Sequence, residues 1–171
     1  MGFMDLAKAR YSVRKFSEKP VEQEKLDLLL EAGNIAPTAK NQQCHRIYVI
    51  RSEEALKKLA QYTPCIYGAG TVLMFGYNTE EQYVNADDPT VQSGPQDASI
   101  VATHIMLEAA ELGLGTCWVN RFLKTEAEKA FNLPEEEKAV LLMPVGYIAE
   151  GCGPSERHGK KKAIEETVKY L

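Results

Sequence analysis

The sequence predicts an α+β fold, an α/β sandwich in which helices flank a mixed β-sheet. The first observation is in residues 96–112, where apolar side chains recur at steps of three and four and so form a broad stripe on one helix face. The second is the nearly unbroken apolar run of residues 139–148, which is typical of a strand buried on both faces. Shorter helix and strand patterns alternate along the rest of the chain. Helices layered on both faces of one sheet account for all of these patterns.

Length and composition favour one domain that spans residues 1–171. The chain is 44% hydrophobic and 26% charged, which is typical of a soluble globular protein. Its 24 acidic and 20 basic residues give a net charge of −4, which argues against a dedicated nucleic-acid binder. No stretch has the pattern of a membrane span or of a secretion signal, so we expect no membrane association and a cytoplasmic location.

The cysteines and histidines are scattered, without the close spacing of metal ligands. We therefore expect reduced, mostly buried thiols and predict no metal site. These residues are Cys44, Cys65, Cys117, Cys152, His45, His104 and His158.

The first dense chemical feature is the segment of residues 10–16, which we expect to be extended. Alternation along an extended segment places Arg10, Ser12 and Arg14 on one side. Two guanidinium groups and a hydroxyl suit a phosphate or the carbonyl edge of a heterocycle. A solvated basic edge strand has the same pattern, and the heptapeptide by itself favours that simpler interpretation.

Pro20 opens a predicted helix over residues 21–34, and a polar loop follows at residues 36–43. Asn41 and Gln43 in this loop carry both donors and acceptors, which suits a ring with mixed hydrogen-bonding edges, such as a pyrimidinedione. Ordinary turn chemistry explains these residues equally well.

Strands are predicted at residues 46–50 and 71–77, with a helix over residues 53–62 between them. The acidic stretch of residues 78–95 has no clear period, and we interpret it as a lid or pocket wall. Tyr83 is a candidate to cover a flat ligand, although a surface tyrosine without a role is an equal alternative.

The long helix is followed by a glycine corner and by a predicted strand over residues 116–119. Gly113 fits the helix stop, and Gly115 allows a close approach of the backbone to a ligand or to packed side chains. The corner lacks the third glycine of a dinucleotide fingerprint and precedes a strand, so a Rossmann fold is excluded.

The C-terminal third contains a predicted helix over residues 124–131, the apolar strand over residues 139–148, and a final helix over residues 163–170. A basic run at residues 157–162 precedes the last helix. Such a run is usually a solvated face, and here it could also contact a phosphate.

The order and spacing of these motifs resemble the FMN-dependent nitroreductase family over nearly the whole chain. The motifs are Arg10-x-Ser12-x-Arg14-x-Phe16, Ala36-Pro37-Thr38-Ala39-x-Asn41-x-Gln43, the helix from Asp97 into Leu112-Gly113-Leu114-Gly115-Thr116-Cys117-Trp118, Pro144-Val145-Gly146-Tyr147, and a lysine-rich turn before Glu165-Glu166.

The resemblance implies bound FMN and assigns roles to particular residues. Arg10 and Ser12 are implied to bind the phosphate and the ribityl chain. Arg14 is implied to lie against the N1 and O2 edge of the flavin, where a positive charge favours the reduced state. A C-terminal lysine is implied to complete the phosphate site, either Lys160 or Lys161.

Two further contact groups follow from the same resemblance. A loop from the partner subunit is implied to reach the flavin through Thr38, Asn41 and Gln43, so that a homodimer with an exchanged C-terminal segment carries two flavins at its interface. The backbone corner implied to approach the flavin near N5 consists of Gly113, Leu114 and Gly115.

The chain also departs from the family pattern. Cys44 and His45 stand where a proline and an aromatic residue are common, which affects the shape of that pocket wall. The C-terminal Arg-x-Pro pattern is replaced at residues 161–163 by Lys-Lys-Ala, and the chain is compact, without an inserted helical segment over the flavin.

The implied function is an FMN-dependent NAD(P)H oxidoreductase with ping-pong kinetics. NADH or NADPH donates hydride to flavin N5, and a nitroaromatic, a quinone or a similar small-molecule acceptor then takes the electrons. No side chain is expected to act as a catalytic acid or base. Three alternatives stay open: a flavin-binding carrier, sensor or regulator with little turnover, a family member with another redox reaction such as reductive dehalogenation, and a protein without flavin that binds another anion.

Overall fold

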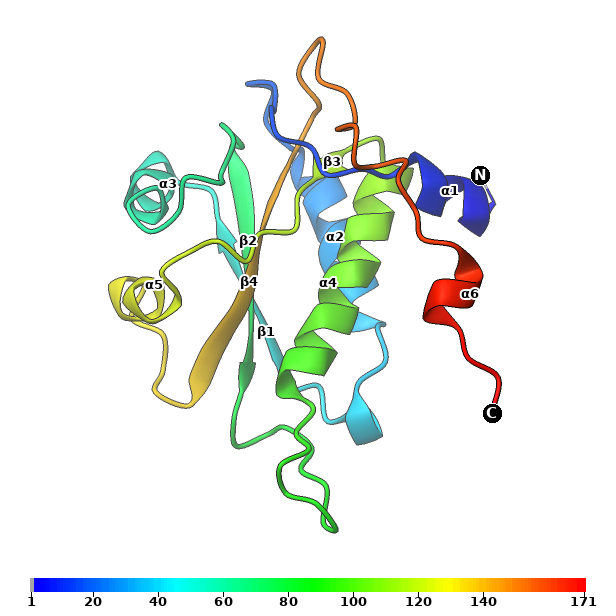
Figure 1. The fold of residues 1–171 in the computed structure, drawn as a ribbon. Coiled ribbons are helices and arrows are strands. Elements are labelled where there is room, and N and C mark those ends of the chain that lie inside the picture. The colour runs from blue at the N-terminus through cyan, green and yellow to red at the C-terminus, as the bar shows by residue number, and fades with distance from the viewer. Residues whose placement is uncertain (1) are drawn as a thin grey trace.

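A four-stranded antiparallel sheet lies at the centre of the computed structural model, which describes residues 2–171 (Figure 1). The strand order is β1-β2-β4-β3. The strands are β1 (His45–Ile50), β2 (Thr71–Asn78), β3 (Gly115–Thr116) and β4 (Glu137–Gly146). The α+β class is thus confirmed, and three of the strands match their predicted positions to within two residues. The third is shorter than predicted, since beyond Thr116 only an isolated bridge joins Val119 to Leu142.

The prediction of a mixed sheet is wrong for these four strands, because every neighbouring pair is antiparallel. Within residues 2–171, parallel pairing is confined to an isolated bridge between Ser12 and Thr116. The connection from β1 to β2 covers residues 51–70 and contains a helix, so it is long enough for a parallel crossover. The sequence pattern therefore did not decide the direction of the strands.

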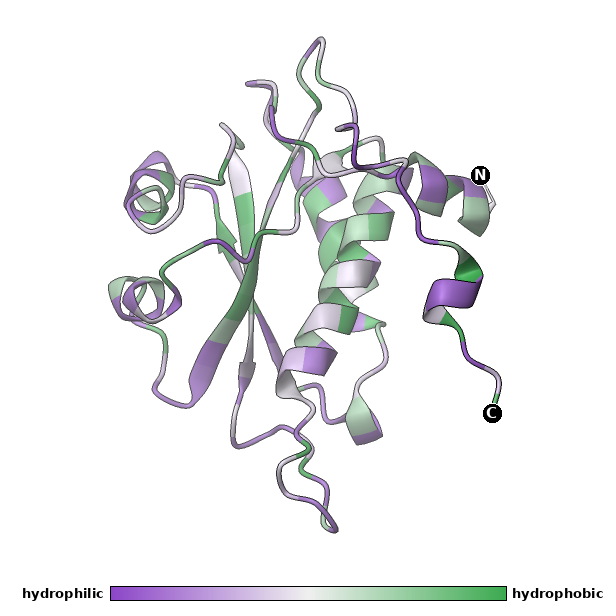
Figure 2. Ribbon diagram, viewed as in Figure 1, coloured by the Kyte–Doolittle hydropathy of each residue, from purple (hydrophilic) through white to green (hydrophobic). Residues whose placement is uncertain are grey.

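Helices cover both faces of the sheet (Figure 1). One face carries α2 (Gln23–Asn34) and α4 (Gly94–Glu111), and the other carries α3 (Glu53–Leu59) and α5 (Lys124–Ala130). In Figure 2 the hydrophobic residues gather in the middle of the central strands and along α4, whereas the start of β4 is hydrophilic. This arrangement confirms the predicted sandwich of helices on a sheet.

Side chains of β2 alternate between two apolar clusters, one on each face of the sheet. Leu73 and Phe75 pack in the cluster that contains α2 and α4. Val72 and Met74 pack in the other cluster, with Leu59 of α3. Each fully buried side chain of this size contributes roughly 1.5–3 kcal/mol relative to an exposed one, so burial on both faces stabilises the centre of the sheet.

The two terminal helices agree least with the sequence patterns. No helix is predicted over α1 (Phe3–Ala9), because its seven residues are too few to show a clear helical period, and none of them is buried in the structure. The last helix was predicted over residues 163–170, but α6 (Ile164–Thr167) is one turn long and equally exposed. Both helices lie on the outer side of α4 in Figure 1. Among residues 2–171, no helix combines the length and the hydrophobicity needed to cross a bilayer.

Candidate functional site

Residues 10–16 and the strand β3 are brought together at one edge of the sheet. The backbone N–H of Val13 donates to the carbonyl of Thr116 at 2.8 Å, and Ser12 forms the parallel bridge with the same residue. Val13 and Phe16 are buried, whereas Arg14 is exposed. The predicted extended segment is therefore confirmed, and about one hundred residues of intervening chain return to it.

The helix stop predicted at Gly113 is also confirmed. Its φ of +74° lies in the left-handed region that favours glycine. The N–H of Leu114 donates to the carbonyl of Ala109 at 2.7 Å, and the N–H of Gly113 donates to the carbonyl of Ala110 at 3.2 Å. These two bonds form a Schellman motif, which satisfies carbonyls at the end of α4. A Cβ built on Gly113 would meet no heavy atom within 4 Å, so a ligand can approach this side of the backbone.

Gly115 has a different role from Gly113. A Cβ at this position would lie 2.6 Å from Cγ2 of Val13 and 2.9 Å from Cγ1 of Ile148. The close approach that the sequence predicted at Gly115 is therefore an approach to packed side chains of the same chain. The absence of a side chain at Gly115 lets residues 10–16 lie directly against β3.

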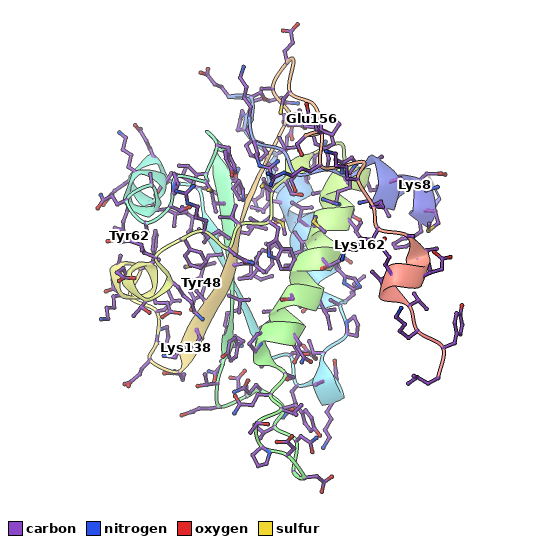
Figure 3. The ribbon with its side chains drawn as sticks, viewed as in Figure 1. Lys8, Tyr48, Tyr62, Lys138, Glu156 and Lys162 are labelled. Atoms are coloured by element: carbon purple, nitrogen blue, oxygen red, sulfur yellow. The ribbon has the colours of Figure 1, made fainter. Side chains whose placement is uncertain are left out.

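Two hollows lie beside this junction. The first, of about 130 Å³, lies between α1, the end of α4 and the glycine corner, and its lining includes Arg10 and residues 113–115. The second, of about 480 Å³, is lined by Arg14, Ser155, Glu156 and Arg157. Figure 3 shows Glu156 at this end of the molecule.

Arg157, which begins the basic run of residues 157–162, is not among the site residues predicted from the sequence. The structure places it beside Arg14 in the lining of the second hollow. No local pattern could have distinguished it from the lysines that follow, because its position depends on the fold of the C-terminal turn.

The arginines at this junction keep donors available for an anion. Within residues 2–171, Arg10 makes no side-chain hydrogen bond and no ion pair. Arg14 donates from Nη1 to the carbonyl of Ser12 at 3.4 Å. Burial raises the pKa of the neighbouring Cys117 thiol, and the positive charges of Arg14 and Arg10 act in the opposite direction. The junction thus combines a positive field with open backbone.

The 38–43 loop is tightly wound. Its centre is the short helix η1 (Ala39–Asn41), and the φ angles of Lys40, Asn41 and Gln43 are +50°, +55° and +52°. The N–H of Gln43 donates to Oγ1 of Thr38 at 3.0 Å. In the part of the chain that the structure describes, the side-chain amide of Asn41 has no hydrogen-bond partner. Left-handed backbone at residues other than glycine is costly, so this loop has to be held by its surroundings.

The 38–43 loop does not meet the glycine corner within one chain. The N–H of Ala39 donates to Oδ1 of Asp97, in the first turn of α4, at 3.0 Å. Gly113 follows the last turn of the same helix. Sixteen positions separate Asp97 from Gly113, which corresponds to about 24 Å at 1.5 Å per residue. Figure 1 shows the loop and the corner at opposite ends of α4.

Lys160 and Lys161 are exposed in the turn that follows Arg157. This turn lies beside the N-terminal segment, because Nε2 of His158 is 3.2 Å from the carbonyl oxygen of Lys8. Neither of the two ammonium groups makes a hydrogen bond or ion pair within residues 2–171. The structure therefore brings the C-terminal turn near residues 8–11, without a contact from either predicted lysine.

Cys44 and His45, which differ from the common residues of the family, directly follow the 38–43 loop in the chain. The Cys44 thiol is buried and donates to Oδ2 of Asp97 at 3.5 Å, and burial, with the neighbouring Asp97 charge, raises its pKa to about 11. Burial also lowers the pKa of His45, with a smaller contribution from Arg46. Cys44 is therefore part of the protein interior and does not face solvent. The other predicted buried thiols, Cys65 and Cys117, are confirmed, while Cys152 is half-buried.

The predicted lid at residues 78–95 contains a short hairpin, closed by a bridge between Val84 and Gln92. The N–H of Ser93 donates to the carbonyl of Tyr83 at 3.0 Å. The Lys40 ammonium lies 4.9 Å from the centre of the Tyr83 ring, so the hairpin packs against the 38–43 loop. Its role as a lid stays a prediction.

Comparison with known proteins agrees with this architecture. The model of the nitroreductase family matches residues 7–65 and 61–147. The chain therefore belongs to the nitroreductase family, as the motifs had indicated.

Individual relatives extend this result. A nitroreductase family protein of known structure from Clostridium difficile is 34% identical, with a TM-score of 0.93 over 99% of this chain and 98% of that chain. A curated protein from Methanothermobacter thermautotrophicus, whose provisional name combines NADH dehydrogenase with NAD(P)H nitroreductase, is 29% identical over 161 residues, which are 90% of this chain and 81% of that protein.

A provisionally named nitroreductase from Exiguobacterium sibiricum was solved in complex with FMN. It is 20% identical, with a TM-score of 0.86 over 100% of this chain and 98% of that chain, and this likeness concerns the fold.

Proposed function

We propose that the protein is an FMN-dependent NAD(P)H oxidoreductase that reduces a small acceptor such as a nitroaromatic or a quinone. The observation that carries this proposal is the junction of residues 10–16 with β3, which sets Arg10 in the hollow beside the open glycine corner and Arg14 in the neighbouring hollow. FMN in the Exiguobacterium structure and the name of the Methanothermobacter relative support the choice of cofactor and of electron donor.

The residues at the junction fit FMN. The Arg10 guanidinium has no protein partner, and a planar set of N–H donors matches a phosphate well. We assign the phosphate and ribityl chain to Arg10 and Ser12, with Lys160, Lys161 or Arg157 as a further cation. Gly113 leaves its side of the backbone open to a flat ring. We therefore assign the region near N5 to the backbone of residues 113–115.

When bound, FMN supplies a ring that accepts hydride from a reduced nicotinamide and passes electrons to an acceptor. Arg14 contributes a fixed positive charge, assigned to the N1 and O2 edge, where negative charge develops on reduction. The chain otherwise holds the reactants in line and excludes water, so no side chain has to donate or accept a proton in this proposal.

A second copy of the chain would complete the site. Within one chain the 38–43 loop and the glycine corner lie at opposite ends of α4, and Asp97 and Gly113 are about 24 Å apart along that helix. A homodimer in which each copy offers its 38–43 loop to the other fits this separation. Exposed apolar side chains at both termini, such as Phe3, Ile164 and Tyr170, would be covered in such a dimer, with the C-terminal segment exchanged. Each copy is proposed to fold as one domain.

The purified protein is expected to show the absorption bands of oxidised flavin, and the bands are expected to bleach when NADH or NADPH is added without air. Oxidised nitroaromatic or quinone should then restore them. A flavin that stays oxidised with both donors would instead favour the binding protein with little turnover. A colourless protein that takes up no added FMN would contradict the proposed function.

Replacing Arg14 with alanine is expected to lower the reduction potential of the bound flavin by about 30 mV or more, where 30 mV corresponds to about 1.4 kcal/mol for a two-electron couple. The physical reason is the loss of a cation beside charge that appears on reduction. Lys15→Ala removes the neighbouring exposed cation and serves as the control. An unchanged potential in Arg14→Ala would remove Arg14 from its assigned role.

A further inference from the structure

We propose that Asp97 is a positioning residue for FMN, because its buried carboxylate holds the 38–43 loop in the shape that presents Asn41 and Gln43 to the flavin. This inference depends on the proposed function. Asp97 lies on α4 and would act only through the loop, so it is distinct from the residues assigned to contact the cofactor.

Asp97 is 2% exposed as a residue, and its carboxylate accepts hydrogen bonds from three segments of the chain. Oδ1 accepts the N–H of Ala39 at 3.0 Å. Oδ2 accepts the hydroxyl of Ser93 at 2.8 Å and the thiol of Cys44 at 3.5 Å. One side chain thus joins the 38–43 loop, the base of the 83–93 hairpin and the entry to β1.

These donors stabilise a charge that has no cationic partner. Within residues 2–171, Asp97 forms no ion pair with a lysine, arginine or histidine. Its place in the first turn of α4 is favourable, because the helix dipole stabilises negative charge there. Burying an ionised carboxylate is expensive unless it is well hydrogen-bonded, so removal of a donor or of the charge disturbs the whole cluster.

The 38–43 loop needs this external support. Lys40, Asn41 and Gln43 all have φ between +50° and +55°. Strained backbone of this kind persists only where the surroundings impose it, and it concentrates at functional sites. The bonds from Asn41 and Gln43 to Thr38 close the loop on itself, and the Ala39 bond to Asp97 fixes the loop to α4.

The proposal is tested with Asp97→Asn, which keeps the size of the side chain. The new amide cannot accept from all three donors, so at least one donor is left without a partner. FMN affinity, measured by quenching of flavin fluorescence, is expected to fall by about tenfold or more, in keeping with the cost of an unsatisfied buried polar group. In the apoprotein, hydrogen exchange at residues 39–43 is expected to accelerate by a similar factor.

Glu128→Gln is the matched control. Glu128 on α5 accepts the backbone N–H of Ala139 at 2.7 Å, which is the same kind of bond on the opposite face of the sheet. This variant is expected to lower stability while leaving the FMN affinity within about twofold. A general loss of stability would affect both variants, whereas loss of positioning affects only Asp97→Asn.

A double-mutant cycle with Asn41→Ala separates a positioning role from a merely structural one. If Asp97 acts through the loop, adding Asp97→Asn to Asn41→Ala weakens FMN binding much less than it does in the wild type. Additive losses would overturn the proposal, and so would a folded Asp97→Asn variant with unchanged FMN affinity.

If Asp97→Asn does not fold at 25 °C, the same comparisons are made with Ser93→Ala, which removes one donor and keeps the carboxylate. An unchanged FMN affinity in Ser93→Ala would overturn the proposal. A loss of FMN affinity that occurs in the wild-type background, but not in the Asn41→Ala background, would support it. A wild-type protein that fails to bind FMN would contradict the proposed function itself. The exchange measurement on the apoprotein, which requires no flavin, still tests whether Asp97 holds the loop.

Discussion

Replacing Arg10 with alanine is expected to weaken FMN binding by about tenfold or more and to leave riboflavin binding nearly unchanged. Arg10 lines the hollow beside the glycine corner and has no protein partner within residues 2–171. Its donors are therefore available for the phosphate, and hydrogen bonds to a charged group contribute about 1.5–3 kcal/mol. Titration of the apoprotein with each flavin, followed by fluorescence, measures the two affinities.

Lys8→Ala is the matched control for Arg10→Ala. Lys8 lies in the last turn of α1, two residues before Arg10 (Figure 3), and it is not among the residues that line the hollow. This control variant should bind FMN with nearly the affinity of the wild type. Equal losses of FMN and riboflavin affinity in Arg10→Ala would show that Arg10 does not contact the phosphate.

Replacing Gly115 with alanine is expected to lower the free energy of unfolding by about 1–3 kcal/mol, the usual cost of overpacking. The added Cβ would lie 2.6 Å from Cγ2 of Val13 and 2.9 Å from Cγ1 of Ile148, so the 10–16 segment has to move away from β3. FMN affinity should fall as well, because that segment carries Arg10 and Ser12. Urea unfolding and flavin titration measure the two effects.

Gly113→Ala separates packing from backbone strain. A Cβ at Gly113 would stand in open space, and its cost comes from the φ of +74°, at about 1–2 kcal/mol for an L-residue. The 10–16 segment should keep its position in this variant. If Gly115→Ala retained the stability and the FMN affinity of the wild type, the packing role given to Gly115 would be wrong.

Much of the fold could be predicted from local patterns. The apolar stripe of residues 96–112 predicted α4, and the apolar run of residues 139–148 predicted the buried strand β4. The patterns did not reveal α1, which has no buried side chain, or the antiparallel direction of all four strands. The seven residues of α1 are too few to show a clear helical period, and the direction of a strand depends on how the connections run, which no local pattern records.

The candidate site, like the fold, could be predicted only in part from the sequence. Arg10, Ser12 and the glycine corner could be selected from residue types and spacing. The sequence does not predict that Arg14 and Arg157 line the same hollow. Nor does it predict that three groups donate hydrogen bonds to the Asp97 carboxylate. These relations join segments that are far apart in the sequence, so no local pattern contains them.

Local patterns were enough to predict the α+β class, the positions of the main helices and strands, and the residue types suited to an anionic cofactor. These properties depend on side-chain periodicity and local chemistry, which act between near neighbours in the chain. Three features depend on the folded chain: the strand directions, the junction of Val13 with Thr116, and the separation of the 38–43 loop from the glycine corner by the length of α4. The physical reason is that these arrangements are set by hydrogen bonds and packing between distant segments, which exist only once the chain has folded.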